Sequence, residues 1–152
     1  VAQNINKDYK GKTPIFLGVL NGSFMFMGDL MKSINLDCFT SFVKMASYEG
    51  TESTGKINEL IGLNEDIEGK DIILVEDIVD TGNTLVKLYE ILGEKKPKSI
   101  KIATLLYKPE AYKKSHKIDY VGKEIPNAFV LGYGLDYDGL GRNLSSIYVL
   151  KD

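Results

Sequence analysis

The chain has 152 residues, of which 43% are hydrophobic and 26% charged, which is typical of one ordinary globular domain with its own core. Its formal net charge of -2 disfavours a protein that coats nucleic acid or binds an anionic membrane. The single cysteine, Cys38, excludes an internal disulfide, and no apolar run approaches the roughly 20 residues that span a bilayer. We therefore expect one cytoplasmic domain over residues 1–152, without nucleic-acid or membrane partners.

The first half of the chain alternates strand and helix patterns. Residues 15–20 form a short apolar run typical of a buried strand, which Asn21-Gly22 closes as a turn. A helix follows, because apolar residues then recur at spacings of three and four over residues 24–34. Residues 38–43 return to extended character. Residues 72–75 are apolar on both faces, as in a central strand that helices cover on both sides.

The second half continues the alternation. Residues 85–92 carry the next helical stripe, and strands are predicted over residues 100–107, 129–131 and 147–150. This order predicts an α/β fold with a mostly parallel central sheet flanked by helices. In such folds ligands bind in a crevice at the carboxyl ends of the strands.

The strongest chemical signal directly follows the predicted central strand. This segment contains three carboxylates followed by a Thr-Gly-Asn-Thr run: Glu76, Asp77, Asp80, Thr81, Gly82, Asn83 and Thr84. Backbone N–H groups left unpaired at the start of a helix bind phosphate. Neighbouring carboxylates accept hydrogen bonds from sugar hydroxyls and hold Mg²⁺ through water. The pattern therefore suits a sugar-phosphate site whose carboxylates can hold Mg²⁺.

Simpler interpretations exist for the same residues. Asp80 or Thr81 alone would serve as a helix N-cap, but a cap does not explain why Glu76 and Asp77 follow the strand without a break. An aspartic-protease triplet would need an all-β dimer, which the following helical stripe argues against. An EF-hand is disfavoured because no Glu closes a 12-residue loop.

The run over residues 75–84, set after a buried strand, resembles the phosphoribosyl pyrophosphate motif of type I phosphoribosyltransferases. From about residue 14 onward the chain resembles the hypoxanthine-guanine branch of that family. The resemblance implies a parallel sheet with a small hood region. It also implies transfer of the 5-phosphoribosyl group from phosphoribosyl pyrophosphate to N9 of hypoxanthine or guanine, giving IMP or GMP plus pyrophosphate. Mg²⁺ and a homodimer or homotetramer are further expectations.

The resemblance also assigns roles within the motif. Residues 80–84 would bind the 5′-phosphate of the donor. Glu76 and Asp77 would hold the ribose hydroxyls and, together with Asp136, the metal. Asp80 would face the purine N7 and act as general base.

A second group of residues would hold the pyrophosphate. The segment Leu20, Asn21 and Gly22 resembles a loop that binds it through backbone N–H groups and often contains a non-proline cis peptide. Taken alone, Asn21-Gly22 is an ordinary turn. Many relatives carry Lys or Arg where this chain has Asn21, and many carry Lys at Asn83. Arg142 would pair with the pyrophosphate through its bidentate guanidinium.

Residues 46–56 form a polar connection that is either a functional lid or an ordinary mobile loop. The resemblance places Ser47 and Tyr48 in a flexible catalytic loop, which closes over the site and excludes water.

The purine would be bound by a third group of residues. Lys108 would donate to the 6-oxo group, although a surface lysine is the commoner explanation for any single Lys. Phe129 would stack on the base, with a core position in a strand as the alternative. The backbone of Val130 would contact the ring edge, and Asp136 would bind a second Mg²⁺ and help with the purine.

Two rival functions remain open at this stage. A regulator of the same fold would bind the donor as an effector and contact nucleic acid, but the lysine-rich patches at residues 95–98 and 113–114 are short. A transferase for adenine, xanthine or orotate is the rival within the enzyme class, and Lys108 favours a 6-oxopurine over adenine. The sequence leaves the preference among hypoxanthine, guanine and xanthine open.

Overall fold

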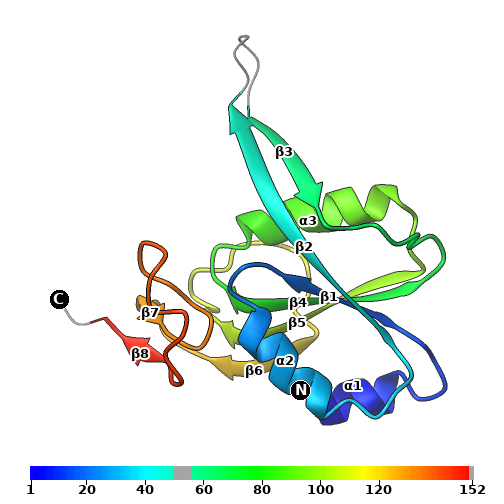
Figure 1. Cartoon of the computed structure of the whole chain (residues 1–152), viewed down its shortest axis with the longest axis horizontal. Coiled ribbons are helices and arrows are strands. Elements are labelled where there is room, and N and C mark those ends of the chain that lie inside the picture. Colours follow the sequence, from blue (N-terminus) through cyan, green and yellow to red (C-terminus); the bar gives the residue numbers. More distant parts are fainter. Residues whose placement is uncertain (50–55, 151–152) are drawn as a thin grey trace.

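The computed structural model describes the backbone of residues 1–49 and 56–150 and the side chains of residues 1–45 and 60–150. Its main element is a six-stranded sheet of order β3-β2-β1-β4-β5-β6, in which β3 alone is antiparallel to its neighbour. The strands are β1 (Ile15–Val19), β2 (Phe39–Glu49), β3 (Lys56–Ile61), β4 (Asp71–Val79), β5 (Ser99–Tyr107) and β6 (Tyr120–Glu124). A separate antiparallel pair, β7 (Val130–Leu131) and β8 (Tyr148–Val149), lies to one side of the sheet (Figure 1).

Helices cover both faces of the sheet. They are α1 (Ala2–Asp8), α2 (Phe24–Lys32) and α3 (Asn83–Glu94). Helix α3 packs on one face, and α1 and α2 pack on the other (Figure 1). The predicted α/β class with a mostly parallel, helix-flanked sheet is therefore confirmed. None of the described helices is long and apolar enough to cross a membrane.

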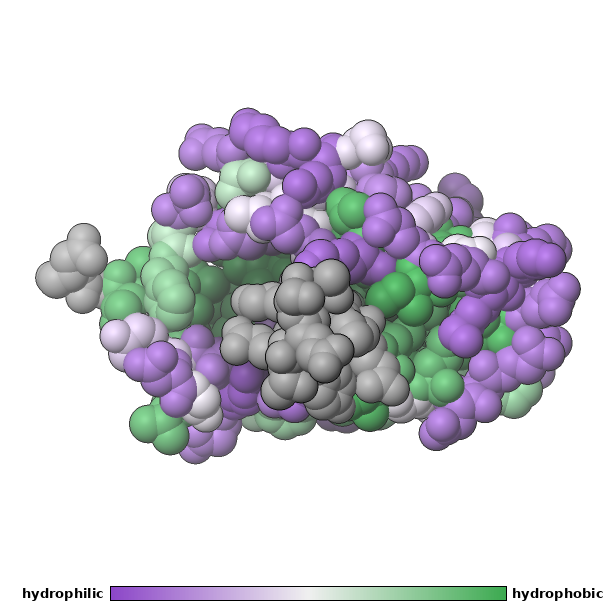
Figure 2. Space-filling model, turned by 90° about the horizontal axis from the view of Figure 1, so that it is seen from above, coloured by the Kyte–Doolittle hydropathy of each residue, from purple (hydrophilic) through white to green (hydrophobic). Residues whose placement is uncertain are grey.

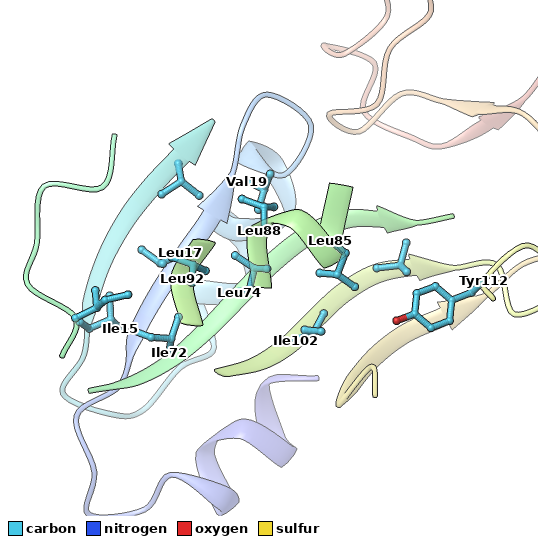
Figure 3. Close-up of a cluster of buried hydrophobic side chains, with 13 residues drawn as sticks. Ile15, Leu17, Val19, Ile72, Leu74, Leu85, Leu88, Leu92, Ile102 and Tyr112 are labelled. Carbon is cyan, nitrogen blue, oxygen red and sulfur yellow. The ribbon is translucent and has the colours of Figure 1, made fainter. Parts of the chain in front are cut away.

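The period of two along each strand explains why the central strands are apolar throughout. Leu17 and Leu74 point to the face where they pack with Leu88 of α3 (Figure 3). Their neighbours Phe16 and Ile73 point to the opposite face and pack with α1 and α2. All four strand residues are fully buried, because each face of β1 and β4 has its own helix layer.

The edges of the sheet differ from the sequence-based expectation. Strand β6 (Tyr120–Glu124), which was not predicted, pairs with β5, whereas the predicted strand at residues 129–131 is the short β7 of the side sheet. Only the first residue of β6 is buried, so its sequence lacks the continuous apolar run of an inner strand. Helix α1 was also not predicted, and it is anchored by fully buried Ile5.

The predicted connection at residues 46–56 is shorter than expected, because β2 continues to Glu49 and β3 begins at Lys56. The two strands pair antiparallel from Lys44↔Ile61 to Glu49↔Lys56 and form an arm that projects from the sheet (Figure 1). Much of the predicted loop is therefore a β-hairpin. The backbones of Ser47 and Tyr48 belong to β2, while their side chains and residues 50–55 lie outside the described residues.

Candidate active site

Two loops meet at the carboxyl ends of the central strands. Strands β1 and β4 are parallel neighbours, so the turn after β1 and the acidic end of β4 lie at the same edge. Gly22 packs directly on Asp77, since a Cβ atom on Gly22 would lie 1.7 Å from Asp77 Oδ2. The peptide bond between Leu20 and Asn21 is cis, as the resemblance implied. The structure thus brings the proposed pyrophosphate turn against the carboxylates.

The Thr-Gly-Asn-Thr run forms the start of α3. Gly82 is the N-cap residue, with φ of 80°, and no side chain caps the helix. The interpretation of Asp80 or Thr81 as a simple N-cap is therefore wrong, and the first N–H groups of α3 have no side-chain partner. A cavity of about 210 Å³ lies here, lined by residues 76–85, with exposed Thr81, Asn83 and Thr84 at the helix start. This arrangement suits a phosphate group.

Tyr112, from the loop after β5, closes the back of this cradle. A Cβ atom on Gly82 would lie 2.4 Å from the Tyr112 ring, so only glycine fits between the ring and the cavity. The Tyr112 hydroxyl donates a hydrogen bond to the carbonyl oxygen of His116 at 2.7 Å, which fixes the ring. Sequence reasoning gave Tyr112 no role, because its contact with Gly82 joins segments that are distant along the chain.

Glu76 and Asp77 lie side by side below the cradle. Glu76 is only 8% exposed, and burial together with the charge of Asp77 raises the pKa of Glu76 well above its usual 4.5. Burial also raises the pKa of Asp77, against the lowering effects of a hydrogen bond from the Ile78 N–H at 2.8 Å and of the Arg142 charge. Two crowded carboxylates favour the binding of a cation or of hydroxyl donors.

The raised pKa of Glu76 predicts that the stability difference between the wild type and a Glu76→Gln variant depends on pH. Below about pH 4.5 the carboxyl is neutral in the folded and unfolded chains alike, so Glu76→Gln should leave the melting temperature unchanged. As the pH rises through the raised folded-state pKa, the wild type must ionise a buried group and loses stability that the variant keeps. We expect the variant to melt several degrees higher at about pH 8 in EDTA.

Differential scanning fluorimetry across this pH range measures the difference. Glu68→Gln, at an exposed position, should track the wild type at every pH. If the melting temperatures of Glu76→Gln and the wild type differ equally at both ends of the pH range, the raised pKa of Glu76 is contradicted.

Lys108 and Asp80 form an ion pair across the ends of two strands. In the β4–β5 pairing Val79 lies opposite Tyr107, so the next residues, Asp80 and Lys108, are neighbours. The Lys108 Nζ atom lies 2.6 Å from Asp80 Oδ2, and Lys108 is only 6% exposed. The alternative of an ordinary surface lysine is therefore wrong.

A second cavity adjoins this ion pair. It also measures about 210 Å³ and is lined by Asp77, Ile78, Asp80, Lys108, Phe129, Val130, Leu135 and Asp136. Every residue that the resemblance assigns to the purine is in this set. Asp77, Ile78 and Asp80 line both cavities, so the phosphate cradle and the second cavity adjoin at these residues.

The aromatic wall of the second cavity is open. Phe129 is 49% exposed, so the alternative of a core strand position for this ring is wrong. Its ring meets Tyr137 edge to face, with the centroids 5.6 Å apart, which leaves a face for a planar ligand. Val130 is buried and pairs with Val149 of β8. Leu135, also buried, lines this cavity, although sequence reasoning gave it no role.

Asp136 and Arg142 pair with each other. Arg142 Nη2 lies 2.9 Å from Asp136 Oδ1, and Arg142 Nη1 donates to the Gly134 carbonyl at 2.7 Å. The backbone N–H of Gly139 donates to Asp136 at 2.7 Å. Both charges act on the pKa of Asp77, which places this pair beside the acidic end of β4. Within the described side chains, no three His, Cys, Asp or Glu groups form a preformed metal site.

Comparisons with known proteins agree with this geometry. The phosphoribosyl transferase domain family matches residues 1–138. Hypoxanthine-guanine phosphoribosyltransferases of Staphylococcus aureus strain Mu50 and of Staphylococcus epidermidis are each 47% identical over 148 residues, covering 97% of this chain and 83% of theirs.

Solved structures of related enzymes also match this chain over almost its whole length. A hypoxanthine phosphoribosyltransferase from Staphylococcus aureus has a TM-score of 0.86 at 45% identity, covering 99% of this chain and 82% of its own. A mutant of the Trypanosoma cruzi enzyme in complex with its product IMP has a TM-score of 0.87 at 41% identity, covering 99% and 81%. The chain therefore belongs to the type I phosphoribosyltransferase family, in its hypoxanthine-guanine branch.

Proposed function

We propose that this chain transfers the 5-phosphoribosyl group from phosphoribosyl pyrophosphate to N9 of hypoxanthine or guanine, giving IMP or GMP and pyrophosphate. The observation that carries this proposal is that the two cavities adjoin and share Asp77, Ile78 and Asp80 as lining residues. A sugar phosphate in the first cavity and a planar base in the second would meet at these residues. Relatives that carry the name hypoxanthine-guanine phosphoribosyltransferase support the choice of base.

The donor binds across the carboxylates and the start of α3. Free N–H groups and the hydroxyls of Thr81 and Thr84 hold the 5′-phosphate. Glu76 and Asp77 accept hydrogen bonds from the ribose hydroxyls. None of the residues that line the described cradle is cationic. Asn83 stands at the position where many relatives carry lysine. Lys114 lies against the start of α3, with its Cγ atom 3.0 Å from the position of a Cβ atom on Gly82, so its ammonium can supplement the N–H groups.

Mg²⁺ fits the residues present. Glu76, Asp77 and Asp136 offer carboxylate oxygens, and burial raises the pKa values of Glu76 and Asp77. Mg²⁺ usually takes one or two carboxylates and completes its shell with water and substrate phosphates. When bound, it would neutralise charge on the pyrophosphate.

The transfer step forms the bond between N9 of the purine and C1 of the ribose and breaks the bond from C1 to the pyrophosphate oxygen. Asp80 accepts the purine proton at N7 as the positive charge develops. Lys108 donates to the 6-oxo group, and Phe129 stacks on the base. The Leu20-Asn21-Gly22 turn and Arg142 hold the leaving pyrophosphate.

Water must be kept from the ribosyl centre during this step. The β2–β3 arm lies beside the strand ends, and Ser47 and Tyr48 are proposed to close over the donor from it.

The oligomeric state and the compartment are part of the same proposal. Hydrophobic surface is visible among hydrophilic side chains in Figure 2, and Phe39, Phe42 and Ile61 are 61%, 41% and 46% exposed. Exposed apolar side chains of this size favour burial between copies of the chain, so we propose a homodimer or homotetramer. Residues 1–152 are proposed to act as one domain in the cytoplasm, which the single Cys38 supports.

A base panel tests the proposed substrate class. The protein is mixed with phosphoribosyl pyrophosphate and Mg²⁺, and absorbance is followed with hypoxanthine, guanine, xanthine or adenine. We expect turnover of hypoxanthine and guanine, and turnover of adenine lower by about 10²-fold or more, because Lys108 would face an amino group instead of an acceptor. Turnover of adenine alone, or of no base despite donor binding, would refute the 6-oxopurine assignment.

A further inference from the structure

The Gly-Tyr-Gly run at residues 132–134 starts the loop that carries Asp136 and Arg142. All three residues have positive φ angles: 93° at Gly132, 51° at Tyr133 and 98° at Gly134. Glycine adopts this region freely, whereas a tyrosine there costs free energy. Such a residue persists where contacts of its side chain compensate, and these residues cluster at functional sites. The contacts of Tyr133 must therefore offset the free-energy cost of its backbone conformation.

Tyr133 anchors the loop on α2. Its ring packs against the buried cluster between the sheet and α2, and its hydroxyl donates a hydrogen bond to Asp29 of that helix. Burial and this bond raise the pKa of Tyr133 to about 12, so the hydroxyl stays protonated and remains a donor at neutral pH. Hydrogen bonds from Lys32 and Tyr133 lower the pKa of Asp29, so its side chain is an ionised acceptor.

Gly134, the next residue, touches both proposed halves of the pyrophosphate site. A Cβ atom on Gly134 would lie 2.1 Å from the carbonyl oxygen of Gly22, so the loop is in direct contact with the turn after β1. The carbonyl oxygen of Gly134 accepts the 2.7 Å hydrogen bond from Arg142 Nη1. One residue thus separates the turn from the guanidinium, and its position sets the distance between them.

We propose that Tyr133 is a positioning residue for pyrophosphate: anchored on Asp29, it holds Gly134 between the turn at Gly22 and Arg142. Helix α2 begins at Phe24, two residues after Gly22, so the anchor joins the loop to the helix that continues the turn. Both halves then keep a fixed spacing before the ligand arrives, which lowers the cost of binding it. This role rests on the proposed function, which supplies the pyrophosphate group.

Tyr133→Phe removes only the hydroxyl and tests the anchor. We expect the dissociation constant of magnesium pyrophosphate, measured by isothermal titration calorimetry, to rise about 5- to 20-fold. The KM for phosphoribosyl pyrophosphate should rise with it, while kcat and the KM for hypoxanthine change less than about twofold. Asp29→Ala should reproduce these changes. Asp29→Asn retains an acceptor oxygen and should keep most of the affinity.

Tyr148→Phe is the matched control, because Tyr148 is 51% exposed in β8 and has no part in the site. Pyrophosphate affinity within about twofold of wild type in Tyr133→Phe would overturn the positioning role. A fall in kcat together with equal rises in both KM values and a lower melting temperature would also overturn it, because these changes together indicate a purely structural role. A wild type that neither binds pyrophosphate nor forms nucleotide would instead refute the proposed function itself, and the positioning role with it.

Discussion

Replacing Asp80 by asparagine is expected to lower kcat for IMP formation by about 10²-fold or more, the range that a general base contributes. The amide cannot take up the proton that leaves N7 of the purine. It also removes the negative partner of Lys108, whose ammonium lies 2.6 Å from the carboxylate in an almost fully buried position. The KM for the donor should change little, because the N–H groups of the cradle remain.

Steady-state kinetics of Asp80→Asn over a range of pH measures this effect. Asp138→Asn is the control, because Asp138 is exposed and asparagine tolerates its φ of 50°. A variant Asp80→Asn with kcat within about threefold of wild type would remove Asp80 from proton transfer.

Adding one methyl group at Gly22 should lower kcat/KM for phosphoribosyl pyrophosphate by about 10²-fold, the typical cost of a misplacement near 1 Å. A Cβ atom at this position would lie 1.7 Å from Asp77 Oδ2 and 2.5 Å from its Cγ, so Gly22→Ala must displace either the turn or the carboxylate. Both hold the donor in the proposed reaction. The KM for hypoxanthine should be affected much less.

Gly28→Ala provides a matched control for this substitution. Gly28 lies in α2, where a Cβ atom meets nothing within 4 Å, and alanine stabilises a helix over glycine by about 0.5–1 kcal/mol. The control should keep full activity and melt at a slightly higher temperature. If Gly22→Ala has the donor KM of the wild type, the turn at Gly22 does not belong to the donor site.

The central strand of the sheet and the segment that follows it could be predicted from the sequence alone. The run at residues 72–75 is apolar on both faces, and the structure buries it between two helix layers as the centre of β4. The strand continues to Val79, so Glu76 and Asp77 lie within β4 and not after it as predicted, while residues 80–84 do follow the strand. Its local pattern was informative because strand, acidic end and helix start are consecutive in the chain.

The remaining features depend on contacts between distant segments. Lys108 meets Asp80 only because β4 and β5 pair in one register, and no local pattern specifies that register. The strands at the edges were missed or misplaced, since β6 has a single buried residue and β7 has two residues in all. The sequence predicted no role for Tyr133, because its hydrogen bond to Asp29 joins residues 104 positions apart.

Phosphorus NMR of a reaction with hypoxanthine, phosphoribosyl pyrophosphate and Mg²⁺ tests the central claim most directly, because it resolves donor, nucleotide and pyrophosphate in one sample. If the chain is a 6-oxopurine phosphoribosyltransferase, IMP and pyrophosphate should appear in equal amounts as the donor disappears. The reaction should stop when hypoxanthine is left out. Donor that persists unchanged with every 6-oxopurine, or that yields ribose 5-phosphate in place of IMP, would contradict the proposed reaction.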